Sequence, residues 1–271
     1  LLVLDGDERV VGLMSKHMLQ NKEFPLFFWG QAYGLTTIEC IFILPFYLTM
    51  GISVLSVKLA MLVLWMTGVV FFYKTFFAIS AGNKKLSVIL TLFLILNPAW
   101  AVWSMKARGG YLTAFTLSSF ATLLLFHPNY RHKKASYIIT GILAAIVFES
   151  QKLWLPGIIV FAAYNMLRQK RVSYFLIFTS LFAITIFAFY CITDNAQPTY
   201  NPPIATNREV LINNLLRIPY YLYASMQGNY YLEEIQSPNL FCAVFALSAS
   251  ILVGVLLFIS SYYVVLRKRH F

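Results

Sequence analysis

Three acidic residues lie close together near the start of the chain, in the segment Asp5-Gly6-Asp7-Glu8. A carboxylate that is partly desolvated gains basicity, which suits it to accept a proton from a hydroxyl group. The same segment also fits a helix N-terminus, with Asp5 as the N-cap and Glu8 as its capping-box partner. Capping explains one or two of the acids but not all three, so the catalytic and the structural interpretations both stay open.

The acidic segment has apolar sequence on both sides. Residues 1–4 are Leu-Leu-Val-Leu, and they resemble the end of a hydrophobic helix, so we expect such a helix to precede this sequence in a longer protein. The stretch from Arg9 to Gln20 predicts an amphipathic helix. Its apolar face is predicted to contain Val10, Leu13, Met14 and Met18.

Two further motifs follow the acidic segment in a fixed order. Residues 28–34 read Phe-Trp-Gly-Gln-Ala-Tyr-Gly and are followed by Glu39, while Asn97-Pro98 precedes the segment Arg108-Gly109-Gly110-Tyr111. The ordered set resembles the first two external loops of GT-C glycosyltransferases over roughly residues 5–125. The likeness is to the branch that contains the protein mannosyltransferases, the lipid A aminoarabinose transferases and the rhizobial galacturonosyltransferases.

The resemblance implies an inverting glycosyltransferase in a membrane. Its donor would be a sugar on a polyprenyl phosphate, and its acceptor would be a hydroxyl group on a lipid, a glycan or a protein. Asp7 matches the catalytic base of the family, and Glu8 and Glu39 match its accessory acids. The implied location is the bacterial inner (plasma) membrane, with the active site on the periplasmic face.

The phosphate of such a donor needs positive charge close to the base. Lys106 and Arg108 are the best candidates, because the glycines after Arg108 let the backbone approach a ligand closely. The resemblance adds Gln31, Tyr33 and Tyr111 as substrate-binding residues. The sequence identifies no cofactor, and no His, Asp or Glu spacing indicates a dedicated metal site, although a divalent ion shared by Asp7 or Glu8 and the phosphate fits the pattern.

Composition places the chain in a membrane. Of 271 residues, 59% are hydrophobic and 11% are charged, whereas soluble domains have about 25% charged residues. The net charge of +11 is then explained by basic loops at one membrane face, and nucleic acid is not an expected partner. The three cysteines show no metal or redox spacing.

The apolar runs predict an all-α, polytopic transmembrane bundle with about seven spans, in a single membrane domain over 1–271. An external catalytic loop, 1–53, carries the amphipathic helix and an interfacial helix at 36–50, which is too short to cross and contains Pro45. Residues 194–239 form a second external loop, and 240–271 hold the last span and a basic end. The predicted spans are 54–79, 86–103, 111–127, 135–150, 153–167, 172–193 and 240–266.

Charge predicts the orientation of these spans. Basic clusters fall at 84–85, 131–134, 168–171 and 267–270, in every second loop, so the positive-inside rule places them in the cytoplasm. All ten acidic residues fall on the other side. Lys58, near the start of a span, is expected to extend its amine toward the membrane surface.

Two other functions remain possible from the sequence. One alternative is a flippase or transporter of lipid-linked sugars, and the other is a non-catalytic membrane subunit. Transporters place ionisable groups near the middle of the bilayer, whereas Lys58, Lys74 and Glu149 lie near the ends of their predicted spans. This placement favours chemistry at the membrane surface.

Overall fold

The computed structural model describes residues 4–31, 34–97 and 103–193. This part of the chain is helical and contains no strand, and its one β-type pairing is an isolated bridge between Phe27 and Leu35. Its helices are α1 (Gly6–Leu19), α2 (Thr37–Met50), α3 (Val54–Ile79), α4 (Lys84–Ile95), α6 (Tyr111–Phe126), α7 (Lys134–Ser150), α8 (Leu155–Gln169) and α9 (Val172–Thr193), with a 3-10 turn at Lys152–Trp154. The all-α class is therefore confirmed for the described residues.

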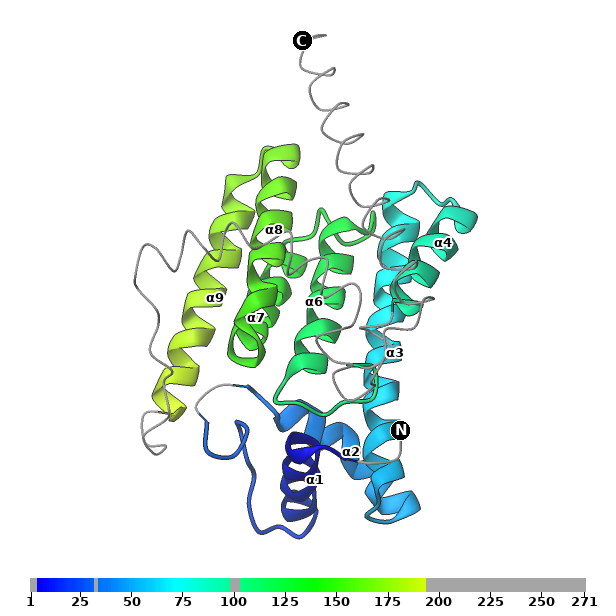
Figure 1. Cartoon of the computed structure of the whole chain (residues 1–271). Helices are drawn as coiled ribbons and strands as arrows, with labels where there is room; N and C mark the ends of the chain where they lie inside the picture. The colour runs from blue at the N-terminus through cyan, green and yellow to red at the C-terminus, as the bar shows by residue number, and fades with distance from the viewer. Residues whose placement is uncertain (1–3, 32–33, 98–102, 194–271) are drawn as a thin grey trace, which may run out of the picture. The chain divides into compact units, whose positions relative to one another are not determined.

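Helix α6 is central to the packing. It contacts α3 and α7 extensively and also packs against α8, while α9 packs on α7 (Figure 1). Helices α1 and α2 lie together at one end of α3 (Figure 1). Helices α3 and α6 pack closely at Gly68, where a Cβ atom would lie 2.5 Å from the ring of Phe115 and 3.2 Å from the Cα atom of Thr116, so a larger residue would clash.

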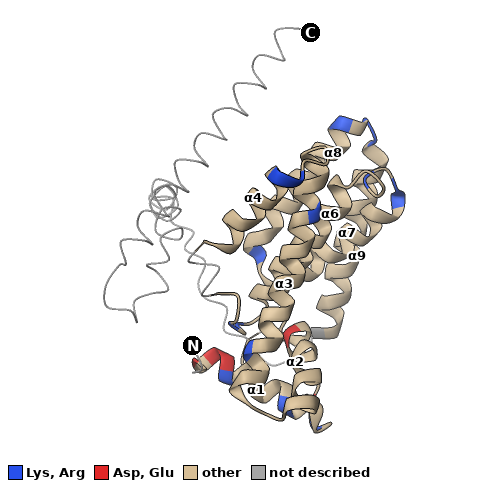
Figure 2. Cartoon of the chain, turned by 90° about the vertical axis from the view of Figure 1, so that its right-hand side faces the viewer, with Lys and Arg blue, Asp and Glu red and all other residues tan. Residues whose placement is uncertain are grey.

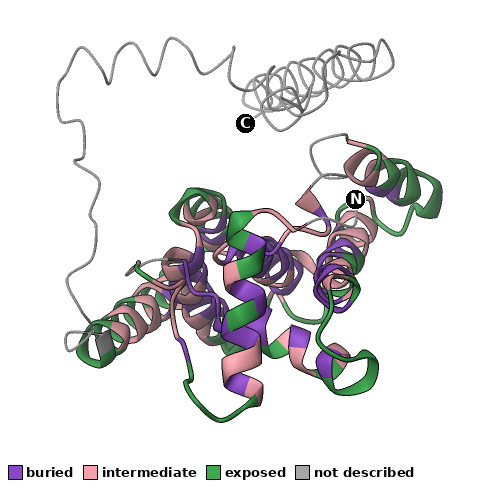
Figure 3. Ribbon diagram, turned by 60° about the horizontal axis from the view of Figure 1, so that its bottom comes forward, coloured by how far each residue is buried: buried purple, intermediate pink, exposed green. Residues whose placement is uncertain are grey.

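A buried hydrophobic cluster lies among α6, α7, α8 and α9. Its members include Leu125, Tyr137, Ile158 and Phe178, each of which is at most 2% exposed. Figure 3 shows the buried residues on the inner faces of the helices and the exposed residues outside. The outer faces still carry large apolar side chains, which is the pattern expected of a protein surrounded by lipid.

Within the described residues, two helices are long and apolar enough to cross a membrane. They are Val54–Ile79 and Val172–Ile192, with mean hydropathies of 2.1 and 2.3, and both coincide with predicted spans. The helices α6, α7 and α8 also lie within two residues of their predicted ranges, but at 16, 17 and 15 residues they are shorter than those two helices. A bundle of about seven spans stays a prediction, and the ranges 194–239 and 240–271 lie outside the described residues.

The prediction of one continuous span at 86–103 is wrong. Helix α4 ends at Ile95, so it has 12 residues and a length of about 18 Å, against a hydrocarbon thickness of about 30 Å. The sequence at Asn97-Pro98 explains the end, because a proline disfavours the helical conformation of the residue before it. Helix α2 is also short, at 14 residues, and its interfacial, non-crossing position stays a prediction.

The acidic residues of the described helices gather at one end, where basic residues such as Lys58 and Arg108 also lie. Figure 2 shows the acidic residues at the end that carries α1 and α2, and basic residues at the opposite end of α7 and α8. The clusters at 131–134 and 168–171 meet there, since Gln169 donates to the carbonyl of Arg131 over 2.9 Å. Lys84 lines a cavity with His127, so the 84–85 cluster belongs to the same end. The predicted charge map thus agrees with the packing, and its cytoplasmic assignment stays a prediction.

The rotation of α1 differs from the amphipathic prediction. The buried face contains Val11, Met14 and Met18, while Leu13 is 47% exposed. Tyr47 of α2 donates to the carbonyl of Gly12, which fixes this face against α2. The prediction is confirmed for Met14 and Met18 and wrong for Leu13, because the buried face is centred on Val11, Met14, Ser15 and Met18 and includes a polar residue.

Packing divides the chain into two compact units, one formed by 1–92 and 103–201 and the other by 93–102 and 202–271. The first unit contains every contact discussed below. Only 93–97 of the second unit belong to the described residues. The single membrane domain over 1–271 stays a prediction.

Candidate active site

Asp5 caps α1 and also binds two cations. Its Oδ1 accepts from the backbone N–H of Glu8, and the side chain of Glu8 accepts from the backbone N–H of Asp5, each over 3.0 Å. The capping box predicted from the sequence is therefore present. The other oxygen, Oδ2, accepts from Lys106 Nζ over 3.3 Å and from Arg108 Nε over 3.0 Å.

This arrangement keeps Asp5 ionised. Partial burial would raise the pKa of Asp5, but the Glu8 N–H and the two cations lower the pKa below its ordinary value. Burial opposes the charge of Arg108 in the same way, and the bonds to Asp5 raise the pKa of the guanidinium. Asp5 thus holds the 104–110 turn against the start of α1, although 103 residues separate Asp5 from Arg108.

The turn that carries Arg108 depends on glycine. Gly110 has a φ of 89°, and a Cβ atom there would lie 2.9 Å from the carbonyl oxygen of Leu35. The backbone can therefore turn sharply into α6 while it lies against the segment before α2. Arg108 extends from this turn toward α1, with its guanidinium 5.4 Å from the ring centre of Trp103.

Asp7 lies beside Arg108 and faces an open pocket. Its Oδ2 is 3.8 Å from Arg108 Nε, and its side chain is 57% exposed, more than twice the exposure of Asp5. The pocket has a volume of about 190 Å³. It is lined by Asp7, Phe28, Gln31, Arg108, Gly109, Tyr111 and Gln151. Four segments that are distant in sequence therefore supply a carboxylate, a guanidinium and two carboxamides to one cavity.

Glu39 is fully buried in the first turn of α2. Neither of its carboxylate oxygens makes a hydrogen bond, although they face the first turn of α6. Burial raises the pKa of Glu39 from 4.5 to about 7, and the backbone N–H groups of Gly110, Leu112 and Thr113 oppose this rise. The dipoles of these three N–H groups favour the ionised carboxylate, although none of the groups is placed to form a hydrogen bond with it. Glu39 lies behind the pocket wall and does not line the pocket.

Glu8 is buried and holds two helices together. It is 1% exposed and forms an ion pair with Lys58 of α3, which is 7% exposed. The expectation that Lys58 extends toward the membrane surface is wrong, because Glu8 binds its amine inside the protein. The pair joins α1 to α3, while Asp7, the residue before Glu8, lines the pocket.

The structure thus brings together most of the predicted site residues. Asp7, Gln31, Arg108 and Tyr111 line the pocket, and Lys106 supports it through Asp5. Glu8 and Glu39 are buried next to it, and Tyr33 lies outside the described residues. No sequence motif indicated Gln151, which reaches the site because the end of α7 packs against the 104–110 turn.

Comparisons with known proteins add no evidence about this site, so its interpretation depends on the geometry of the pocket beside Asp7 and Arg108. No protein-family model matches the sequence, and no curated protein or solved structure matches it. The described residues contain no group of three His, Cys, Asp or Glu side chains that could hold a metal ion. A divalent ion held jointly by Asp7 and a bound phosphate stays a prediction.

Proposed function

We propose that this protein is an inverting glycosyltransferase that uses a polyprenyl-phosphate sugar at the outer face of a membrane. The observation that supports the proposal most strongly is the pocket shared by Asp7 and Arg108, whose charged groups are 3.8 Å apart. A base and a cation at this separation fit a reaction in which a proton is removed beside a departing phosphate.

The reaction is a single displacement at the anomeric carbon of the donor sugar. The acceptor hydroxyl oxygen attacks this carbon while Asp7 accepts the hydroxyl proton, and the bond from the carbon to the phosphate oxygen breaks. Polyprenyl phosphate leaves with the bonding electrons, and the configuration at the anomeric carbon inverts. Arg108 stabilises the negative charge on the leaving phosphate, and its bonds to Asp5 hold the guanidinium in place.

Arg108 keeps donor capacity for this role. Its bonds to Asp5 use Nε and Nη2, and no hydrogen bond of Nη1 is present in the described part of the chain. Gln31 and Gln151 line the same pocket and provide amide groups that suit sugar hydroxyls. Tyr111 and Phe28 add aromatic surface on which a sugar ring can pack.

The test measures release of polyprenyl phosphate from lipid-linked sugars by the full-length protein in membranes. Asp7→Asn keeps the shape of the side chain but removes the base, so turnover should fall by about 10²- to 10⁴-fold. Glu23→Gln is the matched control, because Glu23 is an exposed carboxylate of the same N-terminal segment outside the pocket. If Asp7→Asn released polyprenyl phosphate at the rate of the control, Asp7 would not be the base.

A further inference from the structure

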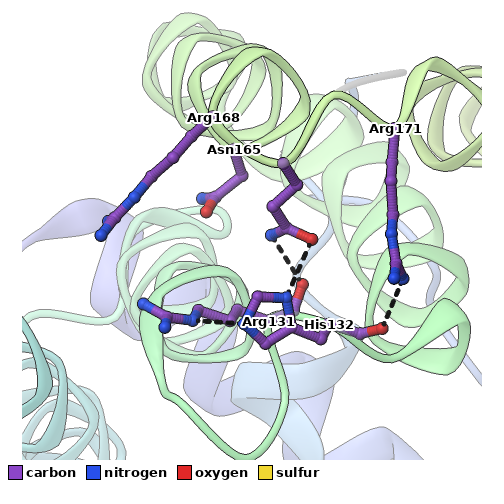
Figure 4. A pocket seen from close by; sticks show the side chains of 6 residues that line it. Arg131, His132, Asn165, Arg168 and Arg171 are labelled. Carbon is purple, nitrogen blue, oxygen red and sulfur yellow. Dashed lines mark hydrogen bonds between the residues drawn. The ribbon is translucent and has the colours of Figure 1, made fainter.

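A second pocket lies at the opposite end of the described helices, far along the chain from Asp7. It has a volume of about 240 Å³ and is formed where the α6–α7 turn meets the α8–α9 turn. Figure 4 shows Arg131 and His132 facing Asn165 and Arg168 of α8, with Arg171 to one side. The six lining residues are Arg131, His132, Asn165, Arg168, Gln169 and Arg171.

Hydrogen bonds across the two turns hold this pocket in shape. Gln169 Nε2 donates to the carbonyl of Arg131 over 2.9 Å, and Gln169 Oε1 lies 3.2 Å from His132 Nδ1. Arg171 Nη1 donates to the carbonyl of His132 over 3.4 Å and to the hydroxyl of Tyr174 over 2.6 Å. A ligand would therefore meet walls that are already ordered, which lowers the entropic cost of binding.

The positive charge in this pocket is unbalanced. It contains three arginines and no acidic residue, and none of the three forms an ion pair within the described residues. Arg168 makes no hydrogen bond there either, and in Figure 4 no dashed line reaches its guanidinium. Like charges held close together repel, so an anion between Arg131 and Arg168 would stabilise the arrangement. Guanidinium groups match phosphate oxygens in geometry, which makes phosphate the favoured anion.

Apolar side chains next to the pocket indicate the source of the phosphate. Leu167, Val172 and Leu176 are 72%, 60% and 59% exposed, and they flank the α8–α9 turn. Helix α9 is also one of the two helices that are long and apolar enough to cross a membrane. A phosphate bound by the arginines would therefore have a surface for acyl chains beside it.

We propose that this pocket binds the phosphodiester headgroup of an anionic membrane lipid. The inference is independent of the glycosyltransferase proposal, since it uses different residues at the other end of α7 and α8. The arginines hold the phosphate oxygens, while the acyl chains lie along α9. An anionic lipid bound there joins the two turns that Gln169 already links.

The experiment counts lipids bound to the full chain by native mass spectrometry in a neutral detergent. The probes are phosphatidylglycerol, phosphatidylcholine and inorganic phosphate. Arg131→Gln/Arg168→Gln removes two charges from the pocket, and Lys133→Gln/Lys134→Gln removes two charges from the same turn outside it. Arg168→Gln alone is a third variant, which should fold normally because Arg168 has no side-chain partner in the described part of the chain.

One molecule of phosphatidylglycerol should bind more tightly than phosphatidylcholine. Arg168→Gln should weaken the binding of phosphatidylglycerol, and Arg131→Gln/Arg168→Gln should weaken it by about 10-fold or more. The lysine variant should change this affinity by less than about 2-fold. Equal losses in the two double variants would overturn the proposal, because general attraction to basic residues would then explain binding. Binding of inorganic phosphate without binding of phosphatidylglycerol would also overturn it, in favour of a soluble phosphate ligand.

Discussion

Glu39 makes the stability of the protein depend on pH. Its pKa is about 7 in the folded protein, against an ordinary value of 4.5. The folded protein therefore keeps a proton that the unfolded chain loses, so the free energy of unfolding falls as pH rises from about 4.5 to about 7 and then levels off. At about 1.4 kcal/mol per pKa unit, the ionised carboxylate costs about 3 kcal/mol above this window.

Glu39→Gln removes this cost while it keeps the size of the side chain. The variant should be more stable than the wild type by about 3 kcal/mol at pH 8 and by no more than about 1 kcal/mol at pH 5. Unfolding of the purified protein in mild detergent, followed by tryptophan fluorescence at both pH values, measures the difference. Glu23→Gln, at an exposed carboxylate, is the control and should change little. A Glu39→Gln protein no more stable than the wild type at pH 8 would refute the reasoning.

Two further predictions concern the charged groups around the pocket. Lys58→Met should destabilise the protein by about 3–5 kcal/mol, because it leaves the buried Glu8 charge without a partner, and adding Glu8→Gln should restore most of the loss in the same unfolding assay. If the double variant stayed as unstable as Lys58→Met, the ion pair would not be the cause. Arg108→Ala should weaken use of the lipid-linked donor in the release assay, and Arg108→Lys should restore only part of it, since lysine lacks the planar fork. Full activity with lysine would argue against a two-pronged phosphate contact.

The sequence predicted the helices well where apolar runs have clear ends. Helix α3 has the predicted bounds, and α9 begins and ends where expected, because charged or polar residues flank both runs. The end of α4 was missed because hydropathy continues past Ile95, although Asn97-Pro98 marks a break. The apolar runs therefore predicted where the helices lie more accurately than they predicted where each helix ends.

The site was predicted in part from the order of its motifs. The contact of Arg108 with Asp7 followed from the requirement for a cation next to the base, and the structure places the two 3.8 Å apart. The pairing of Glu8 with Lys58 could not be predicted, because 50 residues separate them and each residue suits a membrane surface by itself. Such a pair becomes visible only when the packing of α1 against α3 is known.

The exposed turn at 21–24 is the covalent connection from α1 toward α2, but three contacts outside this turn also hold α1 in position. That position depends on the Glu8–Lys58 pair, on Tyr47 bonded to Gly12, and on Asp5 bonded to the 104–110 turn. A protease that cut the backbone after Lys22 would therefore leave α1 attached to the rest of the molecule without a peptide link. The candidate base would remain in its pocket, so chain continuity and site assembly are separate properties of this protein.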